Sequence, residues 1–380
     1  MMKKLLPEVC TIQYGFPFDS AKFSDSDGMP LIRIRDVVRG YSETYTTEEY
    51  KSEYIVHEND LLIGMDGEFN IAKWGKTPAL LNQRVCRLAP KDSIDKDYLF
   101  YFMPIALKRI EEKTPFVTVK HLSAKELNKI EIPVLPLEEQ RKIAETLSKV
   151  DELIAFRDQQ LAKLDELVKA RFVEMFGNPS NNSLGFPYEP LSNCLLSIEN
   201  GKSFVCSNDM RQEENPAILK LSAVTYGVYQ QDENKAILDS SMFVKSAEVH
   251  KGDLLFTRKN TPELVGMCAY VNDTAPNLMM PDLIFRLNTN EKINKIFLWK
   301  LINHEFFRGK IQNIATGSAK SMSNISKERL EKLAIILPPL HLQNDFAALV
   351  ERVDQQKQTI QQSLEKLELM KKALMQEYFG

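Results

Sequence analysis

The sequence predicts a mixed α/β (α+β) fold in which two globular domains of the same kind are separated by two long antiparallel helices of the coiled-coil type. The first observation is an internal repeat, because residues 132–177 align with residues 335–380 without a gap. About a third of the aligned positions are identical, and a repeat this long indicates two related halves rather than a solenoid. The second is a helical periodicity in both copies, and the third is a match between the segments that precede them.

Both copies of the repeat have the pattern of a long amphipathic helix. Their apolar residues recur at steps of three and four, which is the seam of a coiled coil. In the first copy the seam is Ile143, Leu147, Val150, Ile154, Leu161, Leu164, Val168 and Met175. In the second it is Phe346, Val350, Val353, Ile360, Leu364, Leu367, Leu374 and Tyr378. Proline turns at 134–136 and 337–339 open both helices, since proline is tolerated at a helix start.

Each predicted helix has about 40 residues and would span about 60 Å. A helix with so narrow an apolar stripe needs a partner, and the other copy of the repeat is the nearest one. We therefore expect an intramolecular antiparallel pair. Two alternatives are that each helix packs on a different subunit, or that two chains dimerise through these helices. Basic residues interrupt the seams at Arg157, Arg171, Lys357 and Lys371.

The repeat divides the chain into four segments, residues 1–131, 132–177, 178–334 and 335–380. In the first segment, three stretches have the composition of strands, residues 31–35, 60–63 and 85–88. Residues 98–110 read as a helix that Pro104 kinks or breaks. Residues 64–70 read as a turn after a strand, and Ser123 is the expected N-cap of a helical turn within 121–127.

The third segment repeats this order. Residues 217–221, 249–260, 283–287, 297–307 and 323–330 match residues 31–35, 56–67, 85–88, the helix that begins at Tyr98, and residues 120–127. The last match keeps the offset of 203, whereas the earlier matches drift because the loops differ in length. A repeated scaffold with divergent loops is the pattern expected of two modules that recognise different targets.

Composition excludes several classes of protein. The net charge is −3, which argues against a protein that holds nucleic acid mainly by bulk positive charge. No apolar run approaches the length of a membrane span. The five cysteines include no Cys-x-x-Cys pair, which favours a reducing cytoplasm over a disulfide framework or a zinc site.

The motifs of catalysis are also absent from the sequence. It contains no phosphate-binding loop, no dinucleotide-binding glycine motif and no Asn/Asp-Pro-Pro-Tyr/Phe tetrapeptide of amino-methyltransferases. The histidines are isolated, and His57 and His250, which are equivalent in the two halves, are interpreted as structural. Asp66 and Glu68 could pair as acid and base, but the equivalent loop of the second half, 257–260, has no carboxylate, so binding is the better interpretation.

What remains is recognition chemistry, because base edges and phosphates are read by Arg, Lys, Asn, Gln, Ser and Thr on turns and strand ends. For each residue a solvated surface charge is an equally good interpretation. In the first half the candidates are Arg33, Arg35, Phe69, Asn70, Lys73, Asn82, Gln83, Arg84 and Lys120. In the second half they are Lys202, Lys220, Arg258, Lys259, Asn260, Lys320, Ser321 and Asn324. The loops 64–70 and 256–261 are the strongest, followed by 114–122 and 316–324.

Over its full length, the chain resembles the specificity subunits of type I restriction-modification systems. The features that carry the resemblance are the two Pro-x-x-x-Gln turns that end at Gln140 and Gln343, the Asp-Leu-Leu strands at 60–62 and 253–255, and the half-and-half repeat. The resemblance implies two target-recognition domains, each reading one half of a bipartite DNA site. It also implies paired helices that separate the domains and dock methyltransferase subunits. Any helical contribution from the N-terminus to these helices is expected to be missing or very short.

The resemblance implies a non-catalytic chain without a cofactor of its own. S-adenosylmethionine and ATP would belong to the modification and restriction subunits, and double-stranded DNA and those subunits would be the partners, with no membrane involved. Two alternatives from other classes are a nucleic-acid enzyme with a divergent active site and a two-headed adaptor that binds proteins.

Overall fold

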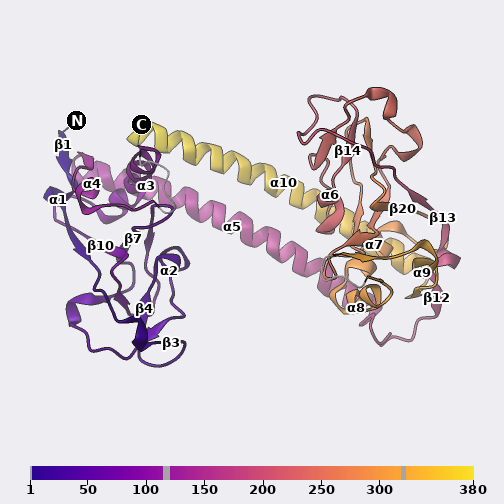
Figure 1. Cartoon of the computed structure of the whole chain (residues 1–380), viewed down its shortest axis with the longest axis horizontal. Helices are drawn as coiled ribbons and strands as arrows, with labels where there is room; N and C mark the ends of the chain where they lie inside the picture. Colours follow the sequence, from indigo (N-terminus) through magenta and orange to yellow (C-terminus); the bar gives the residue numbers. More distant parts are fainter. Residues whose placement is uncertain (1, 114–119, 318–321) are drawn as a thin grey trace. The chain divides into compact units, whose positions relative to one another are not determined.

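The computed structural model describes residues 2–113, 120–317 and 322–380. The chain forms two compact units, Met1–Asp158 with Gln361–Gly380, and Gln159–Ile360. The division falls inside both long helices, α5 (Leu137–Phe176) and α10 (Leu340–Phe379), so each unit contains one half of each helix (Figure 1). Both helices have 40 residues and start 203 positions apart, as the repeat predicts.

The first unit is built from short strands and short helices. Its strands are β1 (Met2–Leu5), β2 (Cys10–Tyr14), β3 (Phe23–Ser24), β4 (Met29–Ile32), β5 (Tyr45–Thr46), β6 (Ile55–Val56), β7 (Leu61–Gly64), β8 (Asn70–Lys73), β9 (Ala79–Leu81), β10 (Val85–Pro90) and β11 (Glu131–Val134). Its shorter helices are α1 (Leu6–Val9), α2 (Ile34–Arg39), α3 (Lys96–Lys113) and α4 (Ala124–Leu127). β2, β10, β7 and β8 form an antiparallel sheet, and a second sheet has the order β3-β5-β4-β9-β6.

The second unit has corresponding elements in the same order. Its strands are β12 (Tyr188–Pro190), β13 (Leu195–Asn200), β14 (Ala217–Leu219), β15 (Asn234–Ala236), β16 (Leu254–Thr257), β17 (Lys259–Asn260), β18 (Cys268–Tyr270), β19 (Leu278–Met279), β20 (Ile284–Thr289), β21 (Ser323–Asn324) and β22 (Ala334–Ile336). Its shorter helices are α6 (Ser222–Thr225), α7 (Lys295–Asn303), α8 (Glu305–Asn313) and α9 (Lys327–Glu331).

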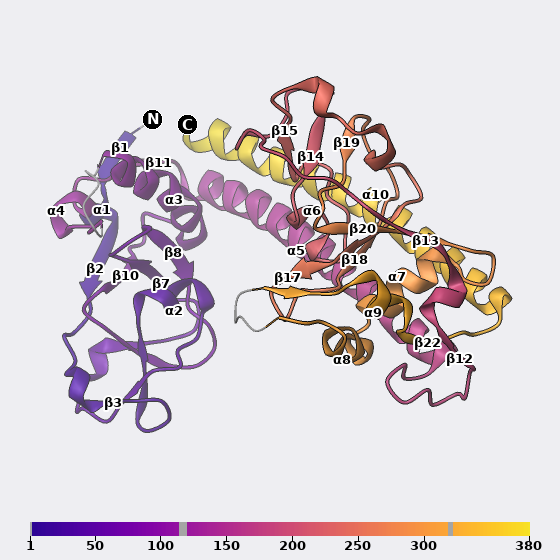
Figure 2. The ribbon, with the colours of Figure 1, turned by 45° about the vertical axis from the view of Figure 1, so that its right-hand side comes forward.

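The four-stranded sheets of the two units have the same strand order (Figure 2), whereas the second sheet has five strands in the first unit and three in the second. The order β2-β10-β7-β8 of the first unit corresponds to β13-β20-β16-β18 of the second. In the second sheet of each unit, one parallel pair, β4 with β9 or β14 with β19, is extended by an antiparallel strand, β5 or β15. The first strand also pairs with the strand before the long helix in both units, β1 with β11 and β12 with β22. The predicted mixed α/β fold with repeated domains is therefore confirmed.

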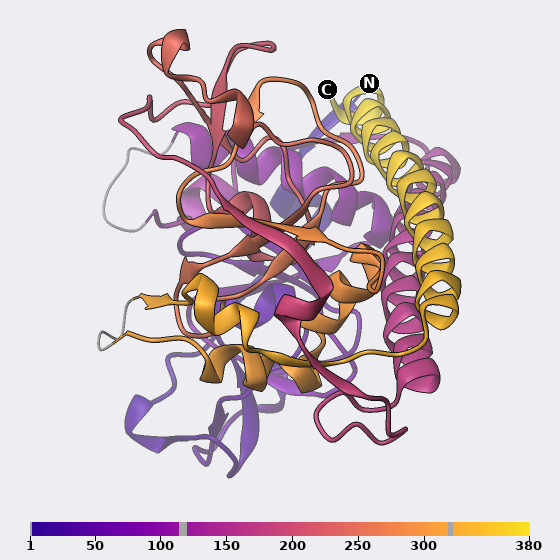
Figure 3. The same ribbon diagram turned by 90° about the vertical axis from the view of Figure 1, so that its right-hand side faces the viewer.

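The halves of α5 and α10 pack against each other in both units, and Figure 3 shows these helices in magenta and yellow. In the first unit Lys371 Nζ lies 2.6 Å from Asp151 Oδ1, and in the second Lys357 Nζ lies 2.7 Å from Asp165 Oδ1. The later residue of α10, Lys371, pairs with the earlier residue of α5, Asp151, whereas Lys357 pairs with Asp165, so the predicted intramolecular antiparallel pairing is confirmed. Two of the basic residues that interrupt the seams thus bridge the two helices.

The repeated glutamines explain why the proline turns are conserved between the halves. Gln140 is fully buried, accepts a hydrogen bond from the Asp95 backbone N–H at 2.7 Å and donates to the Leu135 carbonyl at 2.7 Å. Gln343 is fully buried as well and makes the equivalent bonds to the Asn294 N–H and the Pro338 carbonyl. Each glutamine therefore ties the start of a long helix to the start of α3 or α7, because buried polar groups must find partners.

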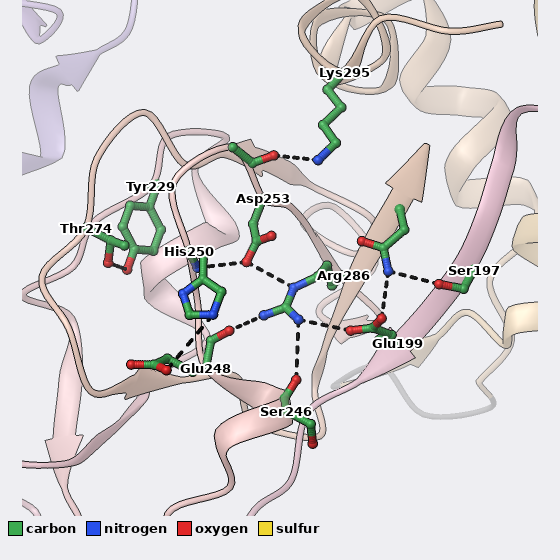
Figure 4. A network of polar contacts seen from close by, with 12 residues as sticks. Ser197, Glu199, Tyr229, Ser246, Glu248, His250, Asp253, Thr274, Arg286 and Lys295 are labelled. Atoms are coloured by element: carbon green, nitrogen blue, oxygen red, sulfur yellow. Dashed lines mark hydrogen bonds and ion pairs between the residues drawn. The ribbon is translucent and has the colours of Figure 1, made fainter. Parts of the chain in front are cut away.

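A second contact that both units share is made by an arginine on a central strand of the antiparallel sheet, β10 or β20, and Figure 4 shows it for the second unit. In the second unit Arg286 Nε lies 3.0 Å from Asp253 Oδ2, and the same carboxylate accepts the His250 N–H at 2.9 Å. In the first unit Arg87 pairs with Asp60 at 3.1 Å, and Asp60 accepts the N–H of His57. In each unit the histidine therefore donates its backbone N–H to the aspartate that pairs with the arginine. These bonds explain structurally why the Val-His…Asp-Leu-Leu pattern is repeated.

Three local predictions need correction. Residues 31–35 are not one strand, because β4 ends at Ile32 and the Asp36 carboxylate accepts the Arg33 N–H at 2.8 Å, which starts α2. α3 runs unbroken through Pro104, since proline removes a single helical N–H and the buried face of α3 packs on the core. The helix predicted to match it at 297–307 is instead interrupted at His304, which caps α8 with its side chain.

The hydrophobic core of each unit includes the end of a long helix. Phe379, at the end of α10, packs against Tyr98 and Phe102 in the first unit, with ring centroids 5.2 and 5.8 Å apart. Phe176, at the end of α5, packs against Phe297 in the second unit at 4.8 Å. Across residues 2–113, 120–317 and 322–380, none of the helices has the length and apolar character needed to cross a bilayer.

Candidate nucleic-acid interface

Four segments that are distant in the sequence meet in the first unit, and we call them together the loop surface. They are residues 15–16, 65–69, 82–84 and 120–122. Backbone hydrogen bonds join them: the Met65 N–H donates to the Arg84 carbonyl at 3.0 Å, and the Leu122 N–H to the Met65 carbonyl at 2.7 Å. The Gln83 N–H donates to the Phe16 carbonyl at 3.0 Å. The Gly67 N–H also donates to the Lys120 carbonyl at 2.9 Å, so backbone bonds hold the loop 65–69 at three places and present its side chains rigidly, which base reading requires.

The second unit has the same loop surface, formed by residues 201–203, 258–261, 281–283 and 322–325. The Arg258 N–H donates to the Leu283 carbonyl at 2.9 Å, and the Ile325 N–H to the Arg258 carbonyl at 2.8 Å. These bonds correspond to those of Met65 and Leu122 in the first unit. β17 also pairs with β21, so that Lys259 lies opposite Asn324. Within the second unit, the candidate loops 256–261 and 316–324 are thus neighbours in space through Lys259 and Asn324.

The two loop surfaces carry different chemistry on the same scaffold. In the first, the Asp66 carboxylate contacts two side chains. Its Oδ1 lies 2.5 Å from His121 Nδ1, and its Oδ2 lies 3.5 Å from Arg84 Nε. In the second, the Arg258 guanidinium donates to Asn324 Oδ1 at 3.4 Å and lies over the Phe285 ring at 5.1 Å. Donors and acceptors are therefore arranged differently at equivalent places.

Several predicted residues of the first unit do lie on or beside this surface. Gln83 and Arg84 belong to it and are exposed, and Arg33 and Arg35 are exposed on either side of Ile34. Ile34 itself packs beside Gly64, because a Cβ placed on Gly64 would lie 3.3 Å from Ile34 Cγ2 and 3.0 Å from Asn70 Oδ1. The start of α2 and Asn70 thus border the loop surface at the end of β7.

Other predicted residues of the first unit have structural partners. Phe69 is 7% exposed and belongs to the hydrophobic core, so its expected place on the exposed face of the loop is corrected, and its DNA contact stays a prediction. Lys73 Nζ lies 2.9 Å from Asp97 Oδ1 and ties β8 to α3. Lys120 Nζ donates to the Glu111 carbonyl at 2.9 Å and also pairs with the carboxylate of that residue.

The predictions for the second unit divide in the same way. Lys202 is exposed on the loop surface, and Arg258, Lys259 and Asn324 form its centre. Asn260 is 7% exposed and donates to Thr225 Oγ1 at 3.0 Å, so its expected exposure is corrected, and its DNA contact stays a prediction. Lys220 lies 3.7 Å from Glu233, where the Ser222 hydroxyl and then the Lys220 charge lower the pKa of the Glu233 carboxyl. Lys320 and Ser321 fall outside the described residues, as do residues 114–119 of the candidate loop 114–122.

Sequence reasoning missed two pairs on the loop surfaces. His121 is half exposed and bonded to Asp66, 55 positions earlier, and the Ser203 hydroxyl donates to Asp282 Oδ1 at 2.5 Å, 79 positions later. No local pattern could reveal contacts across such separations. The sequence alone offered one indication that these segments meet: Met65 aligns with Arg258, and Leu122 aligns with Ile325. As for metals, the described part of the chain brings together no group of three or more His, Cys, Asp or Glu side chains that could hold an ion.

Two copies of one module, each presenting the same loop surface with different side chains, define a duplicated recognition protein. The family model described as "Type I restriction modification DNA specificity domain" matches residues 1–166 and 195–369 of the chain. The chain therefore belongs to the family of type I restriction-modification DNA specificity proteins.

Individual relatives agree with this assignment. The EcoBI specificity subunit of Escherichia coli is 42% identical over 164 residues, which are 43% of this chain and 34% of that protein. The MjaVIII specificity subunit of Methanocaldococcus jannaschii is 24% identical over 385 aligned positions, covering 91% of this chain and 87% of that one. The chain thus spans about a third of the first relative and most of the second.

Solved structures show the same fold. The type I restriction-modification S subunit from M. genitalium has a TM-score of 0.64 at 13% identity. The match covers 100% of this chain and 96% of the S subunit. A structure described as revealing complex assembly and conformational transition of the type I R-M system has a TM-score of 0.57 at 16% identity, with 100% and 97% coverage.

Proposed function

We propose that this chain is the DNA-reading subunit of a type I restriction-modification complex, in which each loop surface reads one half of a bipartite site. The observation that carries the proposal is the repeated loop surface itself: Met65 and Arg258 occupy the same hydrogen-bonded position, yet one surface presents Asp66, His121 and Arg84 and the other Arg258, Lys259 and Asn324. Specificity lies in the contacts to base edges, so different side chains on one scaffold fit an asymmetric target.

The paired helices α5 and α10 would act as the ruler between the half-sites. Their length is fixed by 40 residues each, and their register within each unit is fixed by the Asp151–Lys371 and Asp165–Lys357 pairs. One turn of DNA is about 34 Å, so a helix of this length would separate two half-sites by a spacer that neither domain reads. The same helices would dock methyltransferase subunits.

The chain would be non-catalytic in this complex and hold no cofactor. Methyl transfer from S-adenosylmethionine would take place in the methyltransferase subunits, and ATP would be used by a restriction subunit where the system has one. The relatives' names support the specificity role, and the family model supports DNA as the target.

The test is to change one loop surface at a time and map methylated adenines in a genome that carries the complete system. Arg84→Ala should relax one half-site and Arg258→Gln the other, because losing one base contact costs about 1–3 kcal/mol of discrimination. Arg39→Ala, which removes an exposed arginine from the end of α2, is the matched control. If both variants altered the same half-site, or if neither differed from the control, the assignment of one half-site to each surface would be wrong.

A further inference from the structure

Each loop surface has one arginine at the same place, although the two units supply it from different strands. In the first unit the Met65 N–H donates to the Arg84 carbonyl at 3.0 Å. In the second, the Arg258 N–H donates to the Leu283 carbonyl at 2.9 Å, so this backbone bond joins equivalent positions. The arginine is the acceptor residue in one unit and the donor residue in the other, and an apolar side chain occupies the remaining position. This exchange indicates that the guanidinium matters here, rather than either backbone position.

In the first unit the arginine is held by a carboxylate whose two oxygens are both engaged. Arg84 Nε lies 3.5 Å from Asp66 Oδ2, and His121 Nδ1 lies 2.5 Å from Asp66 Oδ1. The Asp66 side chain is 18% exposed, whereas that of Arg84 is 52% exposed. Within the part of the chain that the structure describes, the terminal nitrogens of Arg84 donate no hydrogen bond. Asp66 therefore holds the guanidinium by its Nε side and leaves the edge with Nη1 and Nη2 for a ligand.

In the second unit an amide and an aromatic ring hold the arginine. Asn324 corresponds to His121, at the repeat offset of 203, and its Oδ1 accepts from Arg258 Nε and Nη2 at 3.4 Å each. The guanidinium also lies over the Phe285 ring, 5.1 Å from its centroid. Nη2 has a second hydrogen, and Nη1 donates no hydrogen bond to any described residue. The same edge of the guanidinium is thus left for a ligand in both units.

Two parallel N–H donors match two neighbouring acceptors, which in DNA belong to guanine or to a phosphate. Guanine presents O6 and N7 side by side in the major groove, and arginine is the residue that most often contacts both. A phosphate also accepts two bonds from arginine. Beside Arg84, however, the Asp66 carboxylate would repel a phosphate, because both are anions. A base edge has no net charge, so the held arginine fits guanine better.

We propose that this guanidinium, Arg84 in the first unit and Arg258 in the second, reads one guanine in each half-site of the DNA target, and that Asp66 and Asn324 position it. The inference rests on the proposed function, since it takes double-stranded DNA as the ligand. It narrows that function by naming the base and the two base atoms, O6 and N7, that are recognised. The half-sites thus share a guanine·cytosine pair and differ at positions that other side chains of the loop surfaces read.

The experiment uses the complete complex with its methyltransferase subunits and DNA duplexes that contain one target site, identified from a map of methylated adenines. Each guanine of the site is replaced in turn by 7-deazaguanine, which pairs with cytosine but has a C–H in place of N7. Affinities are measured for the wild type, Arg84→Lys, Arg258→Lys and Asp66→Asn. Lysine keeps the positive charge but loses the two parallel donors. The matched controls are Arg39→Lys and Glu43→Gln, which alter an exposed arginine–carboxylate pair at 3.6 Å outside the loop surfaces.

In the wild type and both controls, 7-deazaguanine at one position of each half-site should weaken binding about tenfold. Arg84→Lys should abolish this effect in one half-site and Arg258→Lys in the other. The effect retained in the opposite half-site shows that each variant is folded. Asp66→Asn should reduce the effect in the half-site of Arg84 to about threefold, because it weakens a positioning contact and leaves the arginine in place.

Equal effects of 7-deazaguanine in the lysine variants and the wild type would overturn the proposal, because the arginines would then contact a phosphate or no part of the DNA. No effect in the wild type, or loss of the effect in the same half-site by both variants, would overturn it as well. In each of these cases a complex that still reads a bipartite site leaves the proposed function standing. A wild-type complex without preference for any DNA sequence would overturn the proposed function itself.

Discussion

The buried glutamine at the start of α10 allows a stability prediction in which the expected magnitude follows from counted bonds. Gln343 is fully buried and makes hydrogen bonds to the Asn294 N–H at 2.9 Å, the Pro338 carbonyl at 2.7 Å and the Lys292 carbonyl at 3.3 Å. Gln343→Met nearly conserves the side-chain volume, so the cavity cost is small. It leaves one N–H and two carbonyls of the protein interior without this partner. At about 1 kcal/mol for each net bond, the loss is about 3 kcal/mol.

Two measurements check this magnitude. Urea denaturation should show the loss in the free energy of unfolding relative to Gln356→Met, which makes the same substitution at an exposed position of α10. Because a chain with two units need not unfold in one step, hydrogen exchange of the first amides of α7 is the second readout. Asn294 caps α7 by accepting from the Ile296 N–H at 2.9 Å, so losing its own anchor should fray that end. A cost no greater than that of the control would refute the reasoning that this turn is held by its glutamine.

Three further predictions concern single buried side chains, and a fourth concerns the length of the long helices. Asp253→Asn should destabilise the second unit by about 3 kcal/mol in a thermal melt, because it leaves the buried Arg286 without one of its two carboxylate partners, Glu199 being the other. Burial holds the pKa of Lys300 at about 8, below its usual 10.5, so the unfolded chain binds more protons between these values. Stability should therefore rise with pH from about 8 to 10.5, and Lys300→Met should abolish the rise in a pH series of melts. Phe379→Ala should cost about 3–5 kcal/mol in the first unit, measured by urea denaturation. Inserting four residues into both long helices should lengthen the methylated site's spacer by about 6 Å without changing either half-site, and unchanged spacing in a methylation map would contradict the ruler.

The long helices were predictable because their signal is both periodic and repeated. A seam sustained over 40 residues leaves no alternative element, and the second copy confirms the first independently. Short elements lack this redundancy. Residues 31–35 alternate like a strand, yet Asp36 can cap a helix at Arg33, and the two interpretations compete until the surrounding structure decides. The break at His304 has no proline to announce it, because a histidine side chain supplies the cap.

The candidate site was predictable as a set of loops but not as a set of side chains. The equivalence of 64–70 with 256–261 was visible in the sequence, and the structure gives each loop the equivalent position in its own unit. Burial was not visible, so Phe69 and Asn260 were taken for surface groups. Ion pairing was not visible in the sequence either, since Lys73 lies on β8 and its partner Asp97 lies on α3. Polar residues on a turn predict a recognition surface, whereas their individual roles depend on partners that the tertiary fold supplies.

The repeated arginine contact explains how the loop surfaces can differ so completely on one fold. Asp60 with Arg87, and Asp253 with Arg286, fix the start of β7 and of β16 to the neighbouring central strand. The loop that follows each of these strands is held by backbone bonds, such as that from the Arg258 N–H to the Leu283 carbonyl, which any residue except proline can make. Apart from buried residues such as Met65, Phe69 and Asn260, the side chains of the loop are therefore not needed to hold it in place. We therefore expect substitutions of the exposed loop residues to cost little stability, and substitutions at the four arginine and aspartate positions to destabilise the sheet that carries the loop.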